Sequence, residues 1–170
     1  MKYFLDTEFV EDGKTIDLIS IGIVSETGAQ YYAVNRQCDW AAAHAHPFVS
    51  QNVIPFLPAD TGEVNSQWRA KSEIAREVLA FVGDDDSIEF WGDYCSYDWV
   101  ALCQLFGTMM DLPKGWPMFC HDVQVYASIL GVVEFPPYKN WRPHDALFDA
   151  VETRARHEYL AKVAKGERAA

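Results

Sequence analysis

Acidic side chains occur at three separated places in this 170-residue sequence where they could act together in catalysis. Asp6 and Glu8 form the first place, Asp98 the second, and Asp149, with His144 shortly before it, the third. Carboxylate oxygens are preferred ligands of Mg²⁺ and Mn²⁺, and an imidazole that titrates near neutrality can take a proton from water. These residue types allow metal-assisted hydrolysis, provided that the fold brings them to one point.

Asp6 and Glu8 lie two residues apart in the apolar run from Lys2 to Val10, which predicts a strand. Side chains at this spacing emerge on the same face of a sheet. Near the centre of a sheet, unpaired carboxylates are costly, and a bound cation would remove that cost. The alternative is that both acids lie at an exposed strand end and are simply solvated.

Asp98 falls at the start of a predicted helix, Ser96 to Phe106, which follows a buried strand from Ser87 to Trp91. This position suits a ligand that a helix presents to a pocket. An aspartate in the first turn is, however, also stabilised by the helix dipole without any ligand role. Asp93 is a competing acid, less well placed because it lies in the preceding loop.

His144 stands just before a last predicted helix, and Asp149 falls about one turn inside that helix. One helix start can therefore present an imidazole and a carboxylate to the same pocket. Asp145 is interpreted as the structural cap of this helix. His144 could also be an ordinary surface histidine.

The elements that must position these residues predict an α/β fold. Hairpin and helix-end signals give the order βββ, α, β, α, β, α, α, which predicts a mixed five-stranded sheet with helices on both faces, the ribonuclease-H-like architecture. A short helix ended by Pro47 is also expected in the segment 39–58. The expected strands are Lys2 to Val10, Thr15 to Ser25, Gln30 to Asn35, Ser87 to Trp91 and Met118 to Cys120, and the expected main helices are Ser66 to Val82, Ser96 to Phe106, Asp122 to Leu130 and Asp145 to Ala164.

The pattern Asp6-x-Glu8, Asp98 and His144-x-Ala-x-x-Asp149 resembles the DEDDh exonucleases, the superfamily of ribonuclease T, oligoribonuclease and the proofreading exonuclease. Within it, the chain looks most like the bacterial polyadenylate-specific 3′-exoribonuclease group. The similar stretches are Tyr-Phe-Leu-Asp-Thr-Glu-Phe at residues 3–9 and Pro-His-Asp-Ala-Leu-Phe-Asp-Ala at residues 143–150. The resemblance spans about residues 2–155.

The resemblance implies a two-metal 3′-5′ exonuclease that removes nucleoside 5′-monophosphates from adenylate-rich single-stranded RNA. Asp6, Glu8, Asp98 and Asp149 would hold two Mg²⁺ ions, replaceable by Mn²⁺, one activating water and the other stabilising the departing 3′-oxygen. His144 would be the general base. The resemblance also implies a homodimer.

Substrate contacts are expected from residues close to the acids in the sequence. Phe9 and Trp99 could stack on bases, although core packing is the alternative for both. Trp141 carries the same ambiguity. Lys139 and Arg142 are expected to contact phosphates, with a solvated basic loop or a dimer contact as the alternative.

The composition sets limits on function. The length and the 49% apolar content predict one domain over residues 1–170, without an apolar run long enough to cross a membrane. The beginning of the chain lacks the features of a secretory signal, so a cytoplasmic location is expected. The four cysteines include no C-x-x-C pair, and free thiols are expected.

A net charge of −11 argues against a protein that coats long duplexes through phosphate contacts. Three alternatives to an exoribonuclease remain. The first is an exonuclease acting on DNA or short oligonucleotides. The second is a glycoside hydrolase using two of the acids, which would leave the other acids and His144 unexplained. The third is a nucleic-acid-binding module without activity.

Overall fold

A computed structural model describes residues 1–63, 66–84, 87–138 and 142–167. Their centre is a mixed sheet in which the strand order is β4-β3-β2-β1-β5-β6. β1 runs antiparallel to β2, and β2 antiparallel to β3, whereas β5 is parallel to both β1 and β6. The strands are β1 (Lys2–Glu11), β2 (Ile16–Ser25), β3 (Gln30–Asn35), β4 (Trp68–Arg69), β5 (Glu89–Gly92) and β6 (His121–Asp122).

The described sheet has six strands rather than the five that were predicted. The additional strand is β4, two residues that pair in parallel with the end of β3. These residues were predicted to belong to a helix beginning at Ser66, but that helix begins at Lys71, after Ala70 in extended conformation. The last predicted strand is also displaced, because β6 starts at His121, just beyond the predicted Met118 to Cys120.

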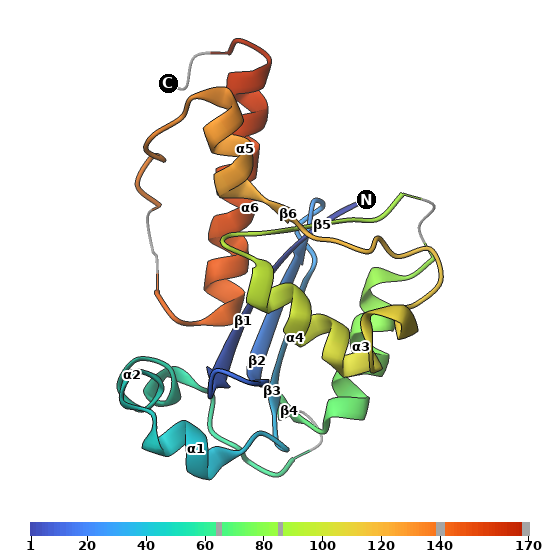
Figure 1. The fold of residues 1–170 in the computed structure, drawn as a ribbon, viewed down its shortest axis with the longest axis vertical. Coiled ribbons are helices and arrows are strands. Elements are labelled where there is room, and N and C mark those ends of the chain that lie inside the picture. The colour runs from blue at the N-terminus through green and yellow to red at the C-terminus, as the bar shows by residue number, and fades with distance from the viewer. Residues whose placement is uncertain (64–65, 85–86, 139–141, 168–170) are drawn as a thin grey trace.

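Helices cover both faces of the sheet, as predicted (Figure 1). The principal helices are α3 (Lys71–Val82), α4 (Ser96–Phe106), α5 (Val123–Leu130) and α6 (Ala146–Ala164). Successive side chains of a strand point to opposite faces. Tyr3 and Leu5 accordingly join the core under α3 and α4, whereas Phe4 joins the core under α5 and α6. Asp6 and Glu8 continue the alternation on the α6 side, two and four residues beyond Phe4.

A third core cluster lies beside the far end of β1, where Val10 and Ile19 pack against small helices. Pro47 starts a second helix there instead of merely ending the first, because proline fits the first turn, where its missing N–H is not needed. The small helices are α1 (Trp40–Ala45), α2 (Pro47–Asn52), the 3₁₀ helix η1 (Ile54–Phe56) and, elsewhere in the chain, the 3₁₀ helix η2 (Met109–Asp111).

Capping residues correctly predicted where two of the main helices begin. Asp122 and Asp145 cap α5 and α6 by accepting hydrogen bonds from backbone N–H groups of the first turn. The four cysteines are free, as expected. No helix in the described ranges is both long and apolar enough to span a membrane.

Candidate active site

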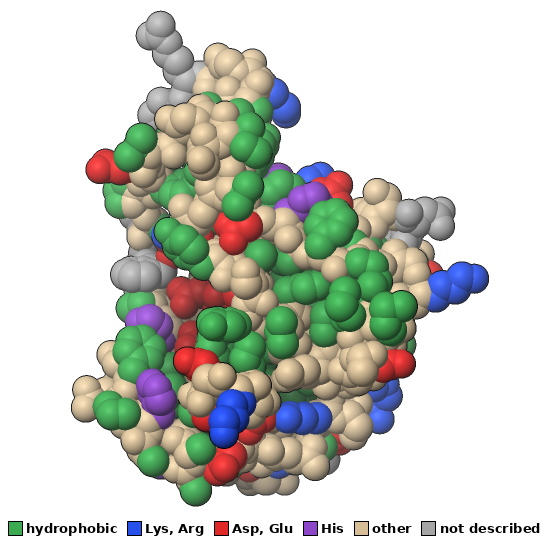
Figure 2. All heavy atoms as spheres, viewed as in Figure 1, with side chains coloured by type: hydrophobic (Ala, Val, Ile, Leu, Met, Phe, Trp, Pro, Cys, Tyr) green, Lys and Arg blue, Asp and Glu red, His purple; other side chains and the backbone are tan. Residues whose placement is uncertain are grey.

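A cavity of about 520 Å³ opens where the acidic end of β1 meets the first turns of α4 and α6. All five residues that the sequence singled out for catalysis line it. Figure 2 shows the recess, with acidic side chains at its base and histidine side chains beside it. The lining consists of Asp6, Thr7, Glu8, Phe9, Asp93, Tyr94, Tyr97, Asp98, Pro143, His144, Asp149, Glu152, Thr153 and Arg156.

The approach of α6 to the sheet depends on Gly22 of β2, the residue opposite Asp6. A Cβ atom at Gly22 would lie 2.3 Å from the carbonyl oxygen of Ala146 and 2.5 Å from the Cα of Leu147. Only glycine therefore lets the first turn of α6 lie this close to β2. The close contact brings the α6 carboxylate of Asp149 to the strand carboxylates.

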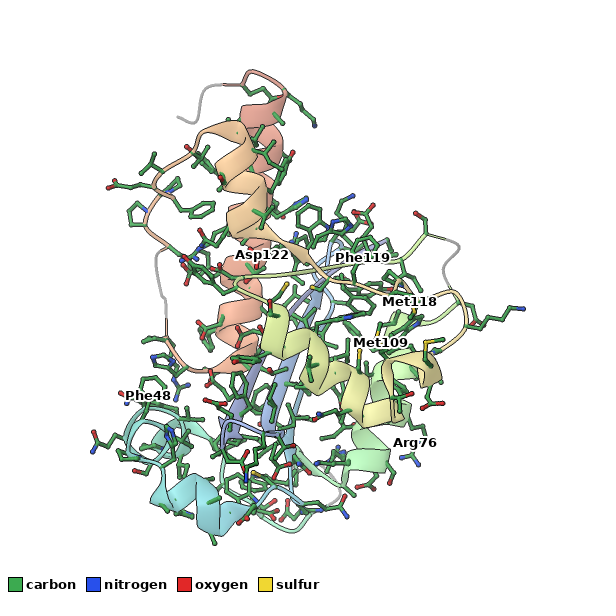
Figure 3. The ribbon with its side chains drawn as sticks, in the orientation of Figure 1. Phe48, Arg76, Met109, Met118, Phe119 and Asp122 are labelled. Atoms are coloured by element: carbon green, nitrogen blue, oxygen red, sulfur yellow. The ribbon has the colours of Figure 1, made fainter. Side chains whose placement is uncertain are left out.

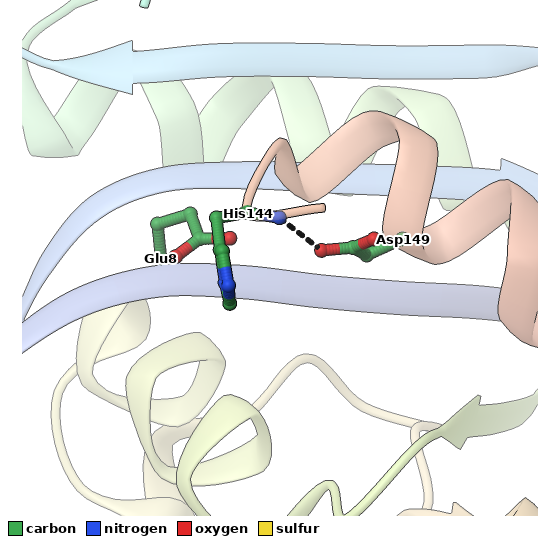
Figure 4. A group of neighbouring side chains, drawn as sticks. All are labelled: Glu8, His144 and Asp149. Atoms are coloured by element: carbon green, nitrogen blue, oxygen red, sulfur yellow. Dashed lines mark hydrogen bonds between the residues drawn. The ribbon is translucent and has the colours of Figure 1, made fainter. Parts of the chain in front are cut away.

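Glu8, His144 and Asp149 form a compact group in the cavity (Figure 4). One potential ligand atom from each lies within 4.8 Å of the others. The backbone N–H of His144 donates a 2.9 Å hydrogen bond to Oδ2 of Asp149, which fixes the loop before α6 against the helix. The His144 ring makes an edge contact with Phe48, with ring centroids 4.8 Å apart.

Asp98 is held by Thr7, a residue that the sequence interpretation did not select. The Thr7 hydroxyl donates a 2.6 Å hydrogen bond, and its backbone N–H a 2.9 Å bond, to the same Oδ1 of Asp98. Thr7 lies between Asp6 and Glu8, on a strand next to β5, which leads into α4. The two bonds tie the first turn of α4 to the strand that carries the other acids.

The electrostatics of the cavity favour a bound cation. Burial raises the pKa of Asp6 well above its ordinary value, with further increases from Asp98 and Glu8. Burial and the charge of Asp149 raise the pKa of Glu8 to about 8. Burial also raises the pKa of Asp98 to about 6, although hydrogen bonds from Thr7 act in the opposite direction. Hard divalent cations bind such clustered carboxylate oxygens and offset their repulsion, so the residues present fit these ions.

Arg156 is the one lysine or arginine among the described residues that line the cavity, and acidic side chains already pair with it. Its guanidinium forms ion pairs with Asp93 and with Glu152. Asp93 also accepts a 2.8 Å hydrogen bond from Gln124. Arg156 thus neutralises acidic side chains at the cavity wall. Asp93, the alternative to Asp98 as the second acid of the site, is paired with Arg156.

The family model of the 3′-5′ exoribonuclease Rv2179c-like domain matches residues 1–160. The chain belongs to this family. The 3′-5′ exoribonucleases MT2234.1 and Rv2179c, from Mycobacterium tuberculosis strains CDC 1551 and H37Rv, are each 43% identical to it over 155 residues. Each alignment covers 88% of this chain and 87% of the relative.

Solved structures show the same fold at low sequence identity. Pop2p of S. pombe, in its Mg²⁺- and Mn²⁺-bound form, superimposes with a TM-score of 0.54 at 12% identity, covering 95% of this chain and 82% of that chain. A chain in the structure of the yeast NOT1 MIF4G domain co-crystallized with CAF1 gives a TM-score of 0.51 at 12% identity, covering 96% of this chain and 80% of that chain. The α/β fold of this family member is therefore ribonuclease-H-like, as expected from the order of its elements.

Of the aromatic residues expected to contact bases, one lies at the cavity and another packs in the core. Phe9 lines the cavity and contacts Tyr97, with ring centroids 5.6 Å apart. Trp99 instead packs against the core beside Phe90, 5.4 Å between centroids, so its placement favours the core alternative and we do not retain it as a base contact.

Arg142 lies next to the cavity residue Pro143 but outside the lining. It pairs with Asp145 at 3.7 Å and lies over the rings of Phe56 and Phe148. Its placement gives no support for a phosphate contact. Lys139 and Trp141 lie outside the described residues.

Several residues that line the cavity were not predicted from the sequence, although the spacing of some of them could have identified them. Glu152, Thr153 and Arg156 follow Asp149 by three, four and seven residues, which is the spacing of one helix face. Tyr94 and Tyr97 lie four residues and one residue before Asp98. Tyr94 could not be placed from spacing alone, because it belongs to the turn rather than to the helix.

Proposed function

We propose that this chain is a metal-dependent 3′-5′ exoribonuclease of the DEDDh type, releasing nucleoside 5′-monophosphates from single-stranded RNA. The observation that carries the proposal is the convergence of Asp6, Glu8, Asp98, Asp149 and His144 in one cavity of a 3′-5′ exoribonuclease family member. Their different elements and their approach through Gly22 make a chance cluster of solvated acids a poor explanation.

Asp6, Glu8, Asp98 and Asp149 would hold two divalent cations. When bound, Mg²⁺ or Mn²⁺ supplies activation of water and stabilisation of the charge on the leaving oxygen. Support comes from the carboxylate donors and their raised pKa values. Pop2p, which shares the fold, has a Mg²⁺- and Mn²⁺-bound form.

His144 is proposed as the general base that takes the proton of the attacking water. It lines the same cavity as the acids, and its position is fixed through its backbone bond to Asp149. The ring is also packed against Phe48, which limits its rotation. An imidazole held beside the carboxylates is placed to take a proton from water in the cavity.

The end of a single strand is the substrate that the charge distribution favours. With a net charge of −11, and Arg156 already paired with Asp93 and Glu152, the described cavity offers little to a long phosphate backbone. Binding should therefore depend weakly on monovalent salt. A loss of ~10³-fold or more in affinity between 50 and 200 mM salt, as for 6 to 10 phosphate contacts, would contradict this mode of binding.

The preference for RNA is supported by the family and by the names of the 43% identical relatives. The preference for adenylate rests on the resemblance of residues 3–9 and 143–150 to the polyadenylate-specific group. A homodimer also rests on resemblance and is checked by light scattering of the purified protein.

The test is degradation of 5′-labelled adenylate, uridylate and cytidylate RNA 20-mers and of an adenylate DNA 20-mer, with Mg²⁺ or with chelator. We expect a ladder that shortens from the 3′ end of RNA, release of nucleoside 5′-monophosphates, and no reaction in chelator. Internal cleavage, or activity without metal, would refute the proposal. Equal rates on the three RNAs would remove the adenylate preference alone, and faster DNA cleavage would favour the DNA alternative.

A further inference from the structure

Tyr94 is a large aromatic residue that lines the cavity yet remains 76% exposed. Within the described part of the chain, its side chain has neither a ring partner nor a hydrogen bond. A tyrosine ring left in water beside a cluster of carboxylates contributes little to the packing of the fold. Its position instead makes an apolar face available at the mouth of the cavity.

The backbone of Tyr94 has an unusual conformation that keeps the ring in this place. Its φ angle is +52°, in the left-handed region that bulky residues rarely adopt. Such conformations persist where the surroundings fix them, and they cluster at functional sites.

The surrounding turn is fixed from several sides. The N–H of Ser96 donates to the Tyr94 carbonyl at 2.9 Å, and the N–H of Cys95 donates to Oδ2 of Asp122 at 3.1 Å. Gly92 has no Cβ, and one there would lie 2.3 Å from the Cβ of Cys95. The turn between β5 and α4 is therefore a rigid support for the Tyr94 ring.

Two further aromatic rings lie in the same lining. Tyr97 is 52% exposed and meets the partly buried Phe9 edge-on, with 5.6 Å between centroids. Phe9 follows Glu8 directly, and Tyr97 precedes Asp98 directly, so this pair belongs to the part of the cavity that contains the acids. Tyr94 lies four residues before Asp98, in the turn that precedes α4, and is more exposed than Tyr97.

We propose that Tyr94 is a stacking platform for the nucleobase next to the 3′-terminal nucleotide, while the Phe9–Tyr97 pair contacts the terminal base. This inference rests on the proposed function. Nucleobases stack on aromatic side chains without strong sequence preference. Because Arg156 is paired with Asp93 and Glu152, base stacking supplies the affinity that phosphate contacts would otherwise supply.

The first test compares Tyr94→Phe, Tyr94→Leu and Tyr94→Gly by steady-state kinetics on an adenylate RNA 8-mer with Mg²⁺. Tyr94→Phe keeps the ring and should stay within about twofold of wild type. Loss of the ring should lower kcat/KM by about 5- to 100-fold, mainly through KM. Glycine tolerates the positive φ, so Tyr94→Gly separates loss of the ring from a failure to fold.

Phe119→Leu is the matched control, because Phe119 is also an exposed aromatic residue, at 56%, but lies outside the cavity lining (Figure 3). It should behave like wild type. If Tyr94→Leu and Tyr94→Gly match wild type on RNA, the inference is overturned while the proposed function stands. An equal loss in Phe119→Leu would overturn it too, because the effect would not be specific to the cavity.

Base stacking is followed directly with the same RNA carrying 2-aminopurine at the second position from the 3′ end. Wild type and Tyr94→Phe should quench its fluorescence, whereas Tyr94→Leu should not. A probe at the fifth position should be unaffected in all variants. If wild type hydrolyses no RNA, the proposed function fails by itself, and quenching that is absent or independent of Tyr94 overturns the stacking inference separately.

Discussion

His144 and Thr7 show how a single residue can serve the cavity without belonging to the carboxylate set. His144 has a positive φ of 62° at the entrance to α6, and its backbone N–H bonds to Asp149. Thr7 directs its hydroxyl and its N–H to Asp98. Each supports a carboxylate at the same time as it lines the cavity, so each can be tested by removing one functional group.

His144→Ala should lower kcat by ~10² to 10⁴, the usual range for loss of a general base, while Mn²⁺ affinity stays nearly unchanged. The imidazole is removed, but the four carboxylates remain. Single-turnover hydrolysis of labelled RNA and calorimetric titration of Mn²⁺ measure the two effects separately. A large loss of Mn²⁺ affinity would make His144 a metal ligand instead.

Thr7→Val should raise the Mg²⁺ concentration required for half-maximal activity by about 10- to 100-fold, the usual effect of losing an outer hydrogen bond to a ligand. The hydroxyl bond lowers the pKa of Asp98, so its loss raises that pKa and shifts the acidic limb of the pH-rate profile upward. Thr7→Ser keeps the hydroxyl and is the control. An identical Mg²⁺ dependence in Thr7→Val and wild type would show that Thr7 has no such role.

At the level of elements, the position of α6 determines whether its side chains reach those of β1 in the cavity. Gly22→Ala would place a Cβ atom against the backbone of Ala146 and Leu147. Rigid backbone atoms cannot yield as a side-chain tip can, so α6 must shift, at a cost of about 1 to 3 kcal/mol. We expect a lower Tm and a large loss of RNA hydrolysis.

Gly62→Ala is the control for Gly22→Ala. Gly62 has a φ of 66° and open space around its Cβ position, so its substitution carries backbone strain without a clash. It should destabilise the protein without lowering the activity per folded molecule. If Gly22→Ala retained full activity and stability, the close approach of α6 would not be required.

Elements with strong local signals were predictable from the sequence. Ser96–Phe106 was predicted with its observed bounds because Gly107 ends it, and α6 because Asp145 caps it. β4 was missed because a two-residue strand depends on pairing with residues of β3 that lie 34 positions earlier, as Val34 does from Trp68, rather than on its own pattern. Pairing across the chain has no local signature of this kind.

The candidate site was predictable to the extent that side-chain chemistry and short spacing determine it. Asp6 and Glu8 share a face because strand side chains alternate, and that follows from the sequence alone. The bond from Thr7 to Asp98 joins residues 91 positions apart, and the exposure of Tyr94 depends on a turn conformation. Neither could be inferred without the fold.

For the whole molecule, we expect the cavity to make stability depend on pH and on divalent metal. The pKa of Glu8 is raised to about 8 in the folded chain, so its contribution to stability is present at low pH and is lost as the pH rises through about 8. In chelator, the free energy of unfolding should fall by about 1.4 kcal/mol per pH unit between pH 6.5 and about 8, and should level off above that. His157, whose pKa is lowered mainly by burial, acts in the opposite direction below that range.

Thermal unfolding at pH 6.5 and 8.5, in chelator and in Mg²⁺, measures this effect. Mg²⁺ should raise Tm more at pH 8.5, where the carboxylates are ionised and bind it more tightly. Glu8→Gln should show a smaller change with pH. A Tm in chelator that rises between pH 6.5 and 8.5 would mean that the acids are not held together as described.

We propose that the carboxylates form a divalent-metal centre on which RNA hydrolysis depends. The most direct measurement is Mn²⁺ stoichiometry by calorimetry, made on the same samples as RNA turnover, for wild type and for Asp6→Asn, Asp98→Asn and Asp149→Asn. We predict two Mn²⁺ per wild-type chain, and in each folded variant weaker binding together with turnover reduced by orders of magnitude. Unaltered turnover in the variants, or wild-type turnover without bound metal, would contradict the account.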